Sequence, residues 1–161
     1  MKYIFNVLVC FLLIGCTNSE QSIVKTDDEL TSNIKLLFDK YVENDFDVSD
    51  YYAADLVAKV NNEEINGLDN LLEGFKAHHE LLYNDIAVND VYVHTNYFSS
   101  GDIWSNAWFT WSGTGKTTGE NYTNRGHFDY KWENGKIVEL LAYFSEESQN
   151  KEVAALTSSS N

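Results

Sequence analysis

The segment Trp132-Glu133-Asn134-Gly135-Lys136-Ile137-Val138-Glu139 decides most about the fold of this 161-residue chain. Asn-Gly is the strongest short signal for a tight β-hairpin, because both residues tolerate the positive φ angles that a two-residue turn needs. Apolar and polar residues alternate on both sides of this turn, which is typical of strands with one buried face. The segment therefore predicts two long antiparallel strands, residues 120–133 and 136–144.

The same period-two pattern continues toward the N-terminus. It predicts strands over residues 86–98 and 103–113, joined to their neighbours by Ser-, Gly- and Asp-rich turns. A shorter extended piece is expected at residues 56–60, followed by a turn at Asn61-Asn62. Four long strands in succession indicate an antiparallel meander.

Helical patterns precede the meander. Apolar residues recur at three- and four-residue steps over residues 27–44, with Asp27 or Asp28 as the N-cap. A short second helix is expected at residues 47–52, and a third begins after Gly67 and runs to about residue 83. About three N-terminal helices packed on one face of an antiparallel sheet define an α+β fold.

The first fifteen residues have the features of a bacterial signal peptide: Lys2, an apolar run over residues 3–14, and a small residue before Cys16. The run is shorter than the roughly 20 residues that span a bilayer. Leu13-Ile14-Gly15-Cys16 resembles the lipobox of bacterial lipoproteins. The resemblance implies cleavage before Cys16 and lipidation of that cysteine, with palmitate among the acyl chains; an ordinary secretory signal is the alternative.

Four segments follow from these patterns: a signal peptide (1–15), a lipidated tether (16–26), one globular domain (27–146) and a polar, disordered tail (147–161). Thr17 stands where an Asp favours inner-membrane retention in many lipoproteins. We therefore expect the protein on the bacterial cell envelope, anchored by lipid to the outer membrane. The sequence is compatible with both the periplasmic and the cell-surface face of that membrane.

The composition excludes some functions. Eleven basic residues against 25 acidic ones give a net charge of −14, which does not suit a nucleic acid, because phosphate binding needs a basic surface. The two cysteines are Cys10, in the signal peptide, and Cys16, so the mature domain has neither a disulfide nor a free thiol. No His, Asp and Glu cluster has the spacing of metal ligands, and we expect no metal and no cofactor.

The order of elements, together with two motifs, resembles the SnoaL-like branch of the nuclear transport factor 2 superfamily over residues 27–146. The motifs are Gly67-Leu68-Asp69-Asn70-Leu71-Leu72 and the 132–139 segment with Tyr143-Phe144 beyond it. The resemblance implies a cone-shaped, cystatin-like fold in which a strongly curved sheet wraps around the helices and leaves a pocket. Its members include polyketide cyclases, isomerases and non-catalytic binding domains, so the fold does not decide the function.

Comparison with the ketosteroid isomerases of this superfamily implies that the tyrosine that donates to the oxyanion falls on Tyr41. The positions of the two carboxylates fall on Val60 and Phe128, which cannot act as a base or donor. A membrane-anchored domain that binds a small apolar or amphipathic ligand without catalysis is therefore expected ahead of an enzyme.

The alternative is a SnoaL-like lyase, isomerase or hydrolase with Tyr41, His127 and Asp129 as catalytic candidates. Arg125, His127 and Asp129 alternate along one side of a strand, opposite an apolar side that should face the core. If the apolar side faces the core, the three polar residues are solvated or take part in a homodimer contact. In the enzyme interpretation they border the pocket instead. A dimeric protein-interaction module is a third possibility.

Aromatic residues make up 14% of the chain and either line a pocket or fill the core of the curved sheet. If they line a pocket, the ligand-binding candidates are Tyr41, Trp108, Phe128, Tyr130, Trp132, Leu140 and Phe144. His78 and His79 are adjacent on a helix and cannot chelate one metal ion together. His79 lies on the apolar stripe and is expected in the core or at the pocket rim.

Overall fold

The computed structural model describes residues 21–159. The signal peptide, Cys16, the first part of the tether and the last two residues of the predicted tail lie outside the described residues. Within residues 21–159, no helix is long and apolar enough to cross a membrane.

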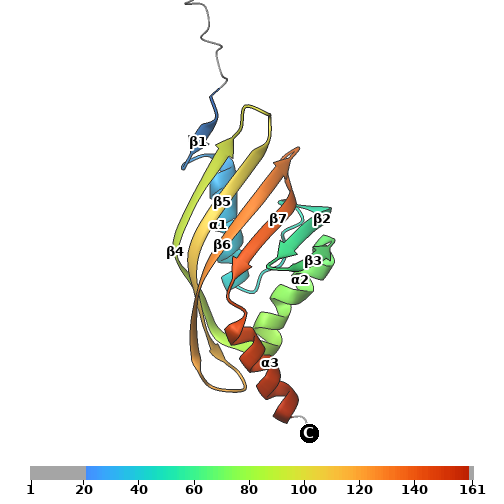
Figure 1. Cartoon of the computed structure of the whole chain (residues 1–161), viewed down its shortest axis with the longest axis vertical. Coiled ribbons are helices and arrows are strands. Elements are labelled where there is room, and N and C mark those ends of the chain that lie inside the picture. Colours follow the sequence, from blue (N-terminus) through green and yellow to red (C-terminus); the bar gives the residue numbers. More distant parts are fainter. Residues whose placement is uncertain (1–20, 160–161) are drawn as a thin grey trace, which may run out of the picture.

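A curved, mixed sheet forms the centre of the molecule (Figure 1), with strand order β1-β4-β5-β6-β7-β2-β3. Strands β4 to β7 form the predicted antiparallel meander, whereas β2 pairs in parallel with β7. The sheet is therefore mixed and not wholly antiparallel. The strands are β1 (Ile23–Lys25), β2 (Tyr52–Val60), β3 (Glu63–Asn66), β4 (Tyr83–Tyr97), β5 (Ile103–Gly115), β6 (Asn121–Glu133) and β7 (Lys136–Phe144).

The helices are α1 (Glu29–Val42), α2 (Leu68–Ala77) and α3 (Glu147–Ser159), and α2 continues into one π-helical turn, η1 (His78–Leu82). Figure 1 shows α1 behind the sheet, α2 beside β2 and β3, and α3 at the end of the molecule where β5 turns into β6. The tight packing partners of α1 are β4 and β5. Strand β1 lies at the opposite end from α3.

Apolar side chains from α1, α2 and the sheet make one core, in which Ile34, Leu56, Ile137 and Leu140 are almost fully buried. Burial of this apolar surface is the main source of stability, since the described chain has no disulfide. The core fixes α1 and α2 against the sheet and so fixes the side chains that they direct toward β5 and β6.

Several local predictions are confirmed. The Asp28 side chain caps α1 by accepting a hydrogen bond of 2.9 Å from the Thr31 amide. Asn134 and Gly135 both have positive φ, at 50° and 76°, as a two-residue hairpin turn requires. The strands predicted at 86–98, 103–113, 120–133 and 136–144 all occur with small shifts of their ends.

Two predictions are wrong, that of the short second helix and that of the disordered tail. Residues 49–51 form a turn and β2 begins at Tyr52, so there is no short second helix. The residues of the predicted tether also contribute β1, which pairs with the edge of β4. The tail from residue 147 is not disordered up to Ser159: it forms α3, which buries the polar residues Ser148 and Glu152. Its sequence carries no apolar stripe, and the contacts that order it come from a distant turn.

Candidate functional site

A cavity of about 110 Å³ lies between the helices and the central strands. Residues of α1, β2, α2, η1, β4, β5, β6 and β7 line it, and Ser145, Ser148 and Gln149 close it on the side of α3. None of the described residues that line it is Asp, Glu, Lys or Arg. Aromatic rings cover much of its wall; they include Phe38, Tyr41, Phe75, Phe109, Trp111 and Phe128.

Three polar side chains meet on this wall. The Tyr41 hydroxyl lies 2.9 Å from Nδ1 of His78, and the indole Nε1 of Trp111 donates a hydrogen bond of 3.1 Å to the same hydroxyl. Tyr41 comes from α1, His78 from η1 and Trp111 from β5. Three elements far apart in the sequence thus converge on one oxygen atom.

The surroundings keep this trio uncharged. Burial raises the pKa of Tyr41, so that its hydroxyl keeps its proton over the physiological range. Burial, with a smaller contribution from the neighbouring His79, lowers the pKa of His78 from 6.5 to about 4. At neutral pH the site therefore presents a neutral phenol and a neutral imidazole.

The ring nitrogen of His78 that carries the proton decides which donors and acceptors a bound molecule contacts. If Nδ1 of His78 carries it, Tyr41 accepts from both His78 and Trp111, and its own O–H is free to donate into the cavity. In that tautomer Nε2 of His78 is an acceptor. If Nε2 carries the proton, Tyr41 donates to Nδ1 and Nε2 becomes the donor. Either arrangement can hold a carbonyl or hydroxyl oxygen.

His78 stands where α2 passes into the π-helical turn. Its own amide bonds to the carbonyl of Gly74, four residues back, and the amide of Tyr83 bonds to the carbonyl of His78, five residues back. The wider turn therefore breaks the 3.6-residue period only beyond His78. Lys116 stabilises the turn, because its Nζ donates to the carbonyls of His79 (2.6 Å) and Glu80 (3.0 Å). The periodicity of the sequence assigns His79 to the inner stripe and misses the part that His78 takes in the cavity.

A glycine makes room on the sheet. A Cβ at Gly126 would lie 2.3 Å from the ring of Phe109, and both residues line the cavity. The far end of the Phe109 ring can therefore lie this close to β6 only because residue 126 has no side chain. The sequence gives Gly126 no turn signal, so its role is visible only in the structure.

Four of the predicted ligand-binding residues line the cavity: Tyr41, Phe128, Tyr130 and Phe144. Trp132 and Leu140 are buried in the core, 4% and 0% exposed, and are not among the lining residues. The predicted set therefore overlaps the cavity lining on α1, β6 and β7, whereas Trp132 and Leu140 lie beyond the lining.

Trp108, His127 and Asp129 lie on the other face of the sheet. The rings of Trp108 and His127 are 4.5 Å apart, and Trp108 and Tyr143 are both more than two-fifths exposed. Nε2 of His127 pairs with Asp129 at 2.8 Å. Since Phe128 faces the cavity, strand alternation turns its neighbours outward. Trp108 is thus no ligand-binding residue of this cavity, and the set Tyr41, His127 and Asp129 is not brought together.

The site residues outside the predicted set are mainly His78 and Trp111, with Tyr83, Asn124, Ser148 and Gln149 at the α3 side. Strand pairing gives one signal for Trp111: it lies opposite Asn124, two residues from Gly126 on the same face. Within residues 21–159, no group of three or more His, Cys, Asp or Glu side chains is placed to hold a metal ion.

The sequence profile of the SnoaL-like domain family matches residues 37–140, which include most of the cavity wall but end before α3. No curated protein sequence matches the chain significantly.

Solved structures share the fold at low identity. A candidate polyketide cyclase from Xanthomonas campestris pv. campestris is 16% identical, with a TM-score of 0.63 over 77% of this chain and 96% of that one. A candidate polyketide cyclase from Pseudomonas putida KT2440 is 15% identical (TM-score 0.65, 78% and 98%). A candidate isomerase from Bacillus subtilis is 12% identical (TM-score 0.62, 77% and 91%). At such identity the likeness shows the fold alone.

Proposed function

The chain belongs to the SnoaL-like domain family, and we propose that its domain binds a small, uncharged, mainly apolar molecule that carries a carbonyl or hydroxyl oxygen. The observation that carries the proposal is the uncharged, aromatic cavity with one hydrogen-bonding trio on its wall. Pockets of this kind gain affinity from apolar contact and orientation from a few placed polar groups.

Charge complementarity narrows the ligand class. A carboxylate or ammonium group in this cavity would lose its hydration without gaining a charged partner, which is costly. A neutral oxygen, in contrast, can take the hydrogen bond that Tyr41 or His78 offers. A ketone or an alcohol with an apolar body therefore fits the lining better than an acid, an amine or a phosphate.

Two matched probes test this proposal. Acetophenone and toluene have similar apolar bodies, but acetophenone alone has an oxygen. We expect Tyr41→Phe to weaken acetophenone binding by about three- to tenfold, the effect of one lost hydrogen bond, and to leave toluene binding unchanged. Ligand-observed NMR on the full chain in lipid nanodiscs, with empty nanodiscs subtracted, measures both affinities.

Tyr143→Phe is the control, because Tyr143 is 48% exposed on the outer face and should affect neither probe. Absence of binding by both probes would contradict the proposal. Equal weakening of both probes in Tyr41→Phe would show that the tyrosine acts by packing and not through its hydroxyl.

A second candidate function is catalysis of proton transfer next to a bound carbonyl, and the pairing of Tyr41 with His78 favours it. In the Nδ1–H tautomer, Tyr41 can donate to the carbonyl oxygen while Nε2 of His78 accepts a proton from the adjacent carbon. Two structural neighbours are named as a candidate polyketide cyclase and a candidate isomerase, and these names are compatible with such chemistry. The low pKa of His78 makes it a weak base, so we place binding first.

Exchange of the acetophenone methyl protons in D₂O separates the two functions. A catalytic site accelerates this exchange, and His78→Gln abolishes the acceleration whereas His127→Gln, on the outer face, keeps it. A binding domain without catalysis leaves the exchange at the rate of buffer. The same probe thus reports affinity and turnover in one sample.

We also propose that the protein is a lipoprotein of the bacterial cell envelope, anchored through lipid on Cys16. The support is the Leu13-Ile14-Gly15-Cys16 motif at the end of a short apolar run. Multiple acyl chains give stable anchoring, at roughly 0.8 kcal/mol per buried methylene. Growth with labelled palmitate should label the wild-type chain and not Cys16→Ser; label in both chains would refute the site.

A further inference from the structure

Helix α3 closes one side of the cavity, but none of its side chains belongs to the hydrophobic core clusters. Ser148 and Gln149 line the cavity, while the two buried residues of the helix, Ser148 and Glu152, are polar. Most helices of this length depend on a packed apolar face, because a short helix alone is marginal in water. The position of α3 therefore depends on hydrogen bonds.

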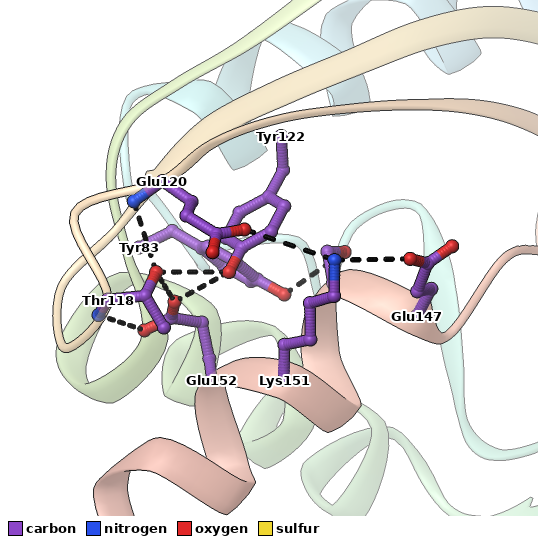
Figure 2. Close-up of polar contacts among 8 residues, drawn as sticks. Tyr83, Thr118, Glu120, Tyr122, Glu147, Lys151 and Glu152 are labelled. Atoms are coloured by element: carbon purple, nitrogen blue, oxygen red, sulfur yellow. Dashed lines mark hydrogen bonds and ion pairs between the residues drawn. The ribbon is translucent and has the colours of Figure 1, made fainter.

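One carboxylate makes most of these bonds (Figure 2). Glu152 is 0% exposed, and its Oε2 accepts from the amides of Thr117 (3.0 Å) and Thr118 (3.5 Å), in the turn between β5 and β6. Its Oε1 accepts from the hydroxyls of Thr118 and Tyr122, the latter at 3.0 Å. A single side chain thus joins the middle of α3 to a turn about 35 residues earlier in the sequence.

The turn has a space for this carboxylate. A Cβ at Gly115 would lie 2.0 Å from Oε1 of Glu152, so any side chain there would displace it. Two backbone amides and two hydroxyls donate to the carboxylate, and the glycine leaves the space that it occupies. Hydrogen bonds to a charged group are stronger than those between neutral groups.

Further polar contacts of α3 lie at its first turn and on its surface, and the helix also contacts η1. Tyr83 donates to Oγ of Ser148 at 3.3 Å, and Asn124 donates to the carbonyl of Ser145 at 2.7 Å. Lys151 pairs with Glu147 and Glu120 on the outside, and Figure 2 shows these pairs beside the buried network. Exposed ion pairs contribute little, so release of Glu152 would remove the main polar contacts between the middle of α3 and the turn that joins β5 to β6.

We propose that α3 is a lid over the ligand cavity and that Glu152 is the positioning residue that holds it closed. The inference rests on the proposed function, because a lid matters only if molecules enter the cavity. An element held by one polar network and few apolar contacts belongs to the low-stability part of a fold, which opens locally before the core does. Entry and exit then proceed past α3, at a rate set by the Glu152 contacts.

The turn between β5 and β6 also contacts η1, the helical turn that carries His78. Lys116, adjacent to the two threonines, donates from Nζ to carbonyls of η1 and from its backbone amide to the carbonyl of Leu82 at 2.8 Å. The turn therefore joins the lid to the helical turn that places His78 beside Tyr41. Closing of the lid and positioning of the polar trio depend on one segment.

Two measurements on the full chain test the lid without a ligand. Hydrogen exchange, followed by mass spectrometry, reports opening of residues 147–159. Labelling of a Val88→Cys variant with N-ethylmaleimide reports access to the cavity, because Val88 lines it; the peptide that contains residue 88 is followed, so that Cys10 and Cys16 do not interfere. Tyr92→Cys, on a residue that is 55% exposed, controls for reagent reactivity.

We expect Glu152→Gln to accelerate both exchange in α3 and labelling at position 88 by on the order of tenfold or more, because a donor replaces an acceptor oxygen of the charged group. Glu147→Gln is the matched control in the same helix: its side chain is 74% exposed, and it should change neither rate. If Glu152→Gln does not fold, Thr118→Val removes a donor to the same carboxylate and takes its place.

Faster exchange in α3 with unchanged labelling at position 88 would overturn the lid, because the cavity would then be entered elsewhere. Unchanged exchange would overturn the role of Glu152. Failure of acetophenone and toluene to bind would contradict the proposed function alone, since neither lid measurement needs a ligand.

Discussion

Gly126 illustrates how one absent side chain makes space for the cavity wall. Its position on β6 would bring a Cβ to 2.3 Å from the Phe109 ring, and Phe109 is buried between α1 and the sheet, with its ring centroid 4.7 Å from that of Phe38. We expect Gly126→Ala to destabilise the domain by about 1–3 kcal/mol, the usual cost of overpacking a core. Chemical denaturation measures the change in the free energy of unfolding.

Gly74→Ala is the control, and we expect it to raise the free energy of unfolding. Gly74 lies inside α2, and a Cβ there would meet nothing within 4 Å. Alanine should stabilise the helix by about 0.5–1 kcal/mol, because it restricts the unfolded chain without a steric cost. Equal destabilisation by both substitutions would show that Gly126 matters for its backbone and not for the space beside Phe109.

The imidazole of His78 makes stability depend on pH. Its pKa is lowered from 6.5 to about 4, so the unfolded state binds this proton first as the pH falls. The contribution of the neutral imidazole is complete above pH 6.5 and is lost as the pH falls to about 4. NMR titration should give a midpoint near 4 for the resonance that His78→Gln removes, and a midpoint near 6.5 would contradict the burial of His78.

Single residues differ in how far the sequence predicts them. Tyr41 could be predicted at the cavity, because it lies on the regular apolar stripe of α1. His78 was missed although it lies three residues after Phe75 and its amide still bonds four residues back, to Gly74. Two adjacent histidines fit the inner stripe almost equally, and the sequence pattern assigned His79 to it. Trp108 and Trp111 are three residues apart on β5, so they face opposite sides; composition alone does not say which side holds the cavity.

At the scale of elements, α3 and the β5–β6 turn form one unit. A substitution of Gly115 tests whether the contact between them contributes to stability. Gly115→Ala would place a Cβ 2.0 Å from Oε1 of Glu152. We expect a loss of about 1–3 kcal/mol in the free energy of unfolding, from disruption of hydrogen bonds to a buried charged group. Denaturation of the wild-type chain and Gly115→Ala measures it.

A double-mutant cycle with Glu152→Ala separates this contact from other effects of the alanine. In the Glu152→Ala background the carboxylate is gone, so Gly115→Ala should cost almost nothing. A cost that persists in that background would place the effect in β5 itself.

The sequence predicted elements well where their stability is local. Strands β4 to β7 carry their own alternation and turn residues, and Asp28 caps α1 through a neighbour three residues away. Helix α3 was missed because its order comes from Glu152 meeting a turn more than 30 residues distant. Residues 47–52 read as a helix, but Tyr52 begins β2, which pairs with β7 over 80 residues later; tertiary pairing overrides the local pattern there.

At the scale of the whole molecule, β1 and α3 lie at opposite ends (Figure 1). Ile23 pairs with Tyr97 at the edge of the sheet, next to the turn at residues 98–102. If Cys16 is lipidated as proposed, the seven residues from Cys16 to Ile23 reach at most about 25 Å when fully extended. The β1 end must then stay close to the membrane, and the α3 side of the cavity can face the aqueous phase.

Paramagnetic relaxation in nanodiscs tests this orientation. A spin label is attached at Ser100→Cys, beside β1, or at Asn150→Cys, in α3, and nickel-chelating lipids supply the relaxation agent at the membrane surface. We expect stronger relaxation at position 100, because the short tether limits how far that end can move from the lipid. Equal relaxation would indicate that the domain lies flat on the membrane, and stronger relaxation at position 150 would mean that the lid faces the lipid, from which an apolar ligand would then enter the cavity.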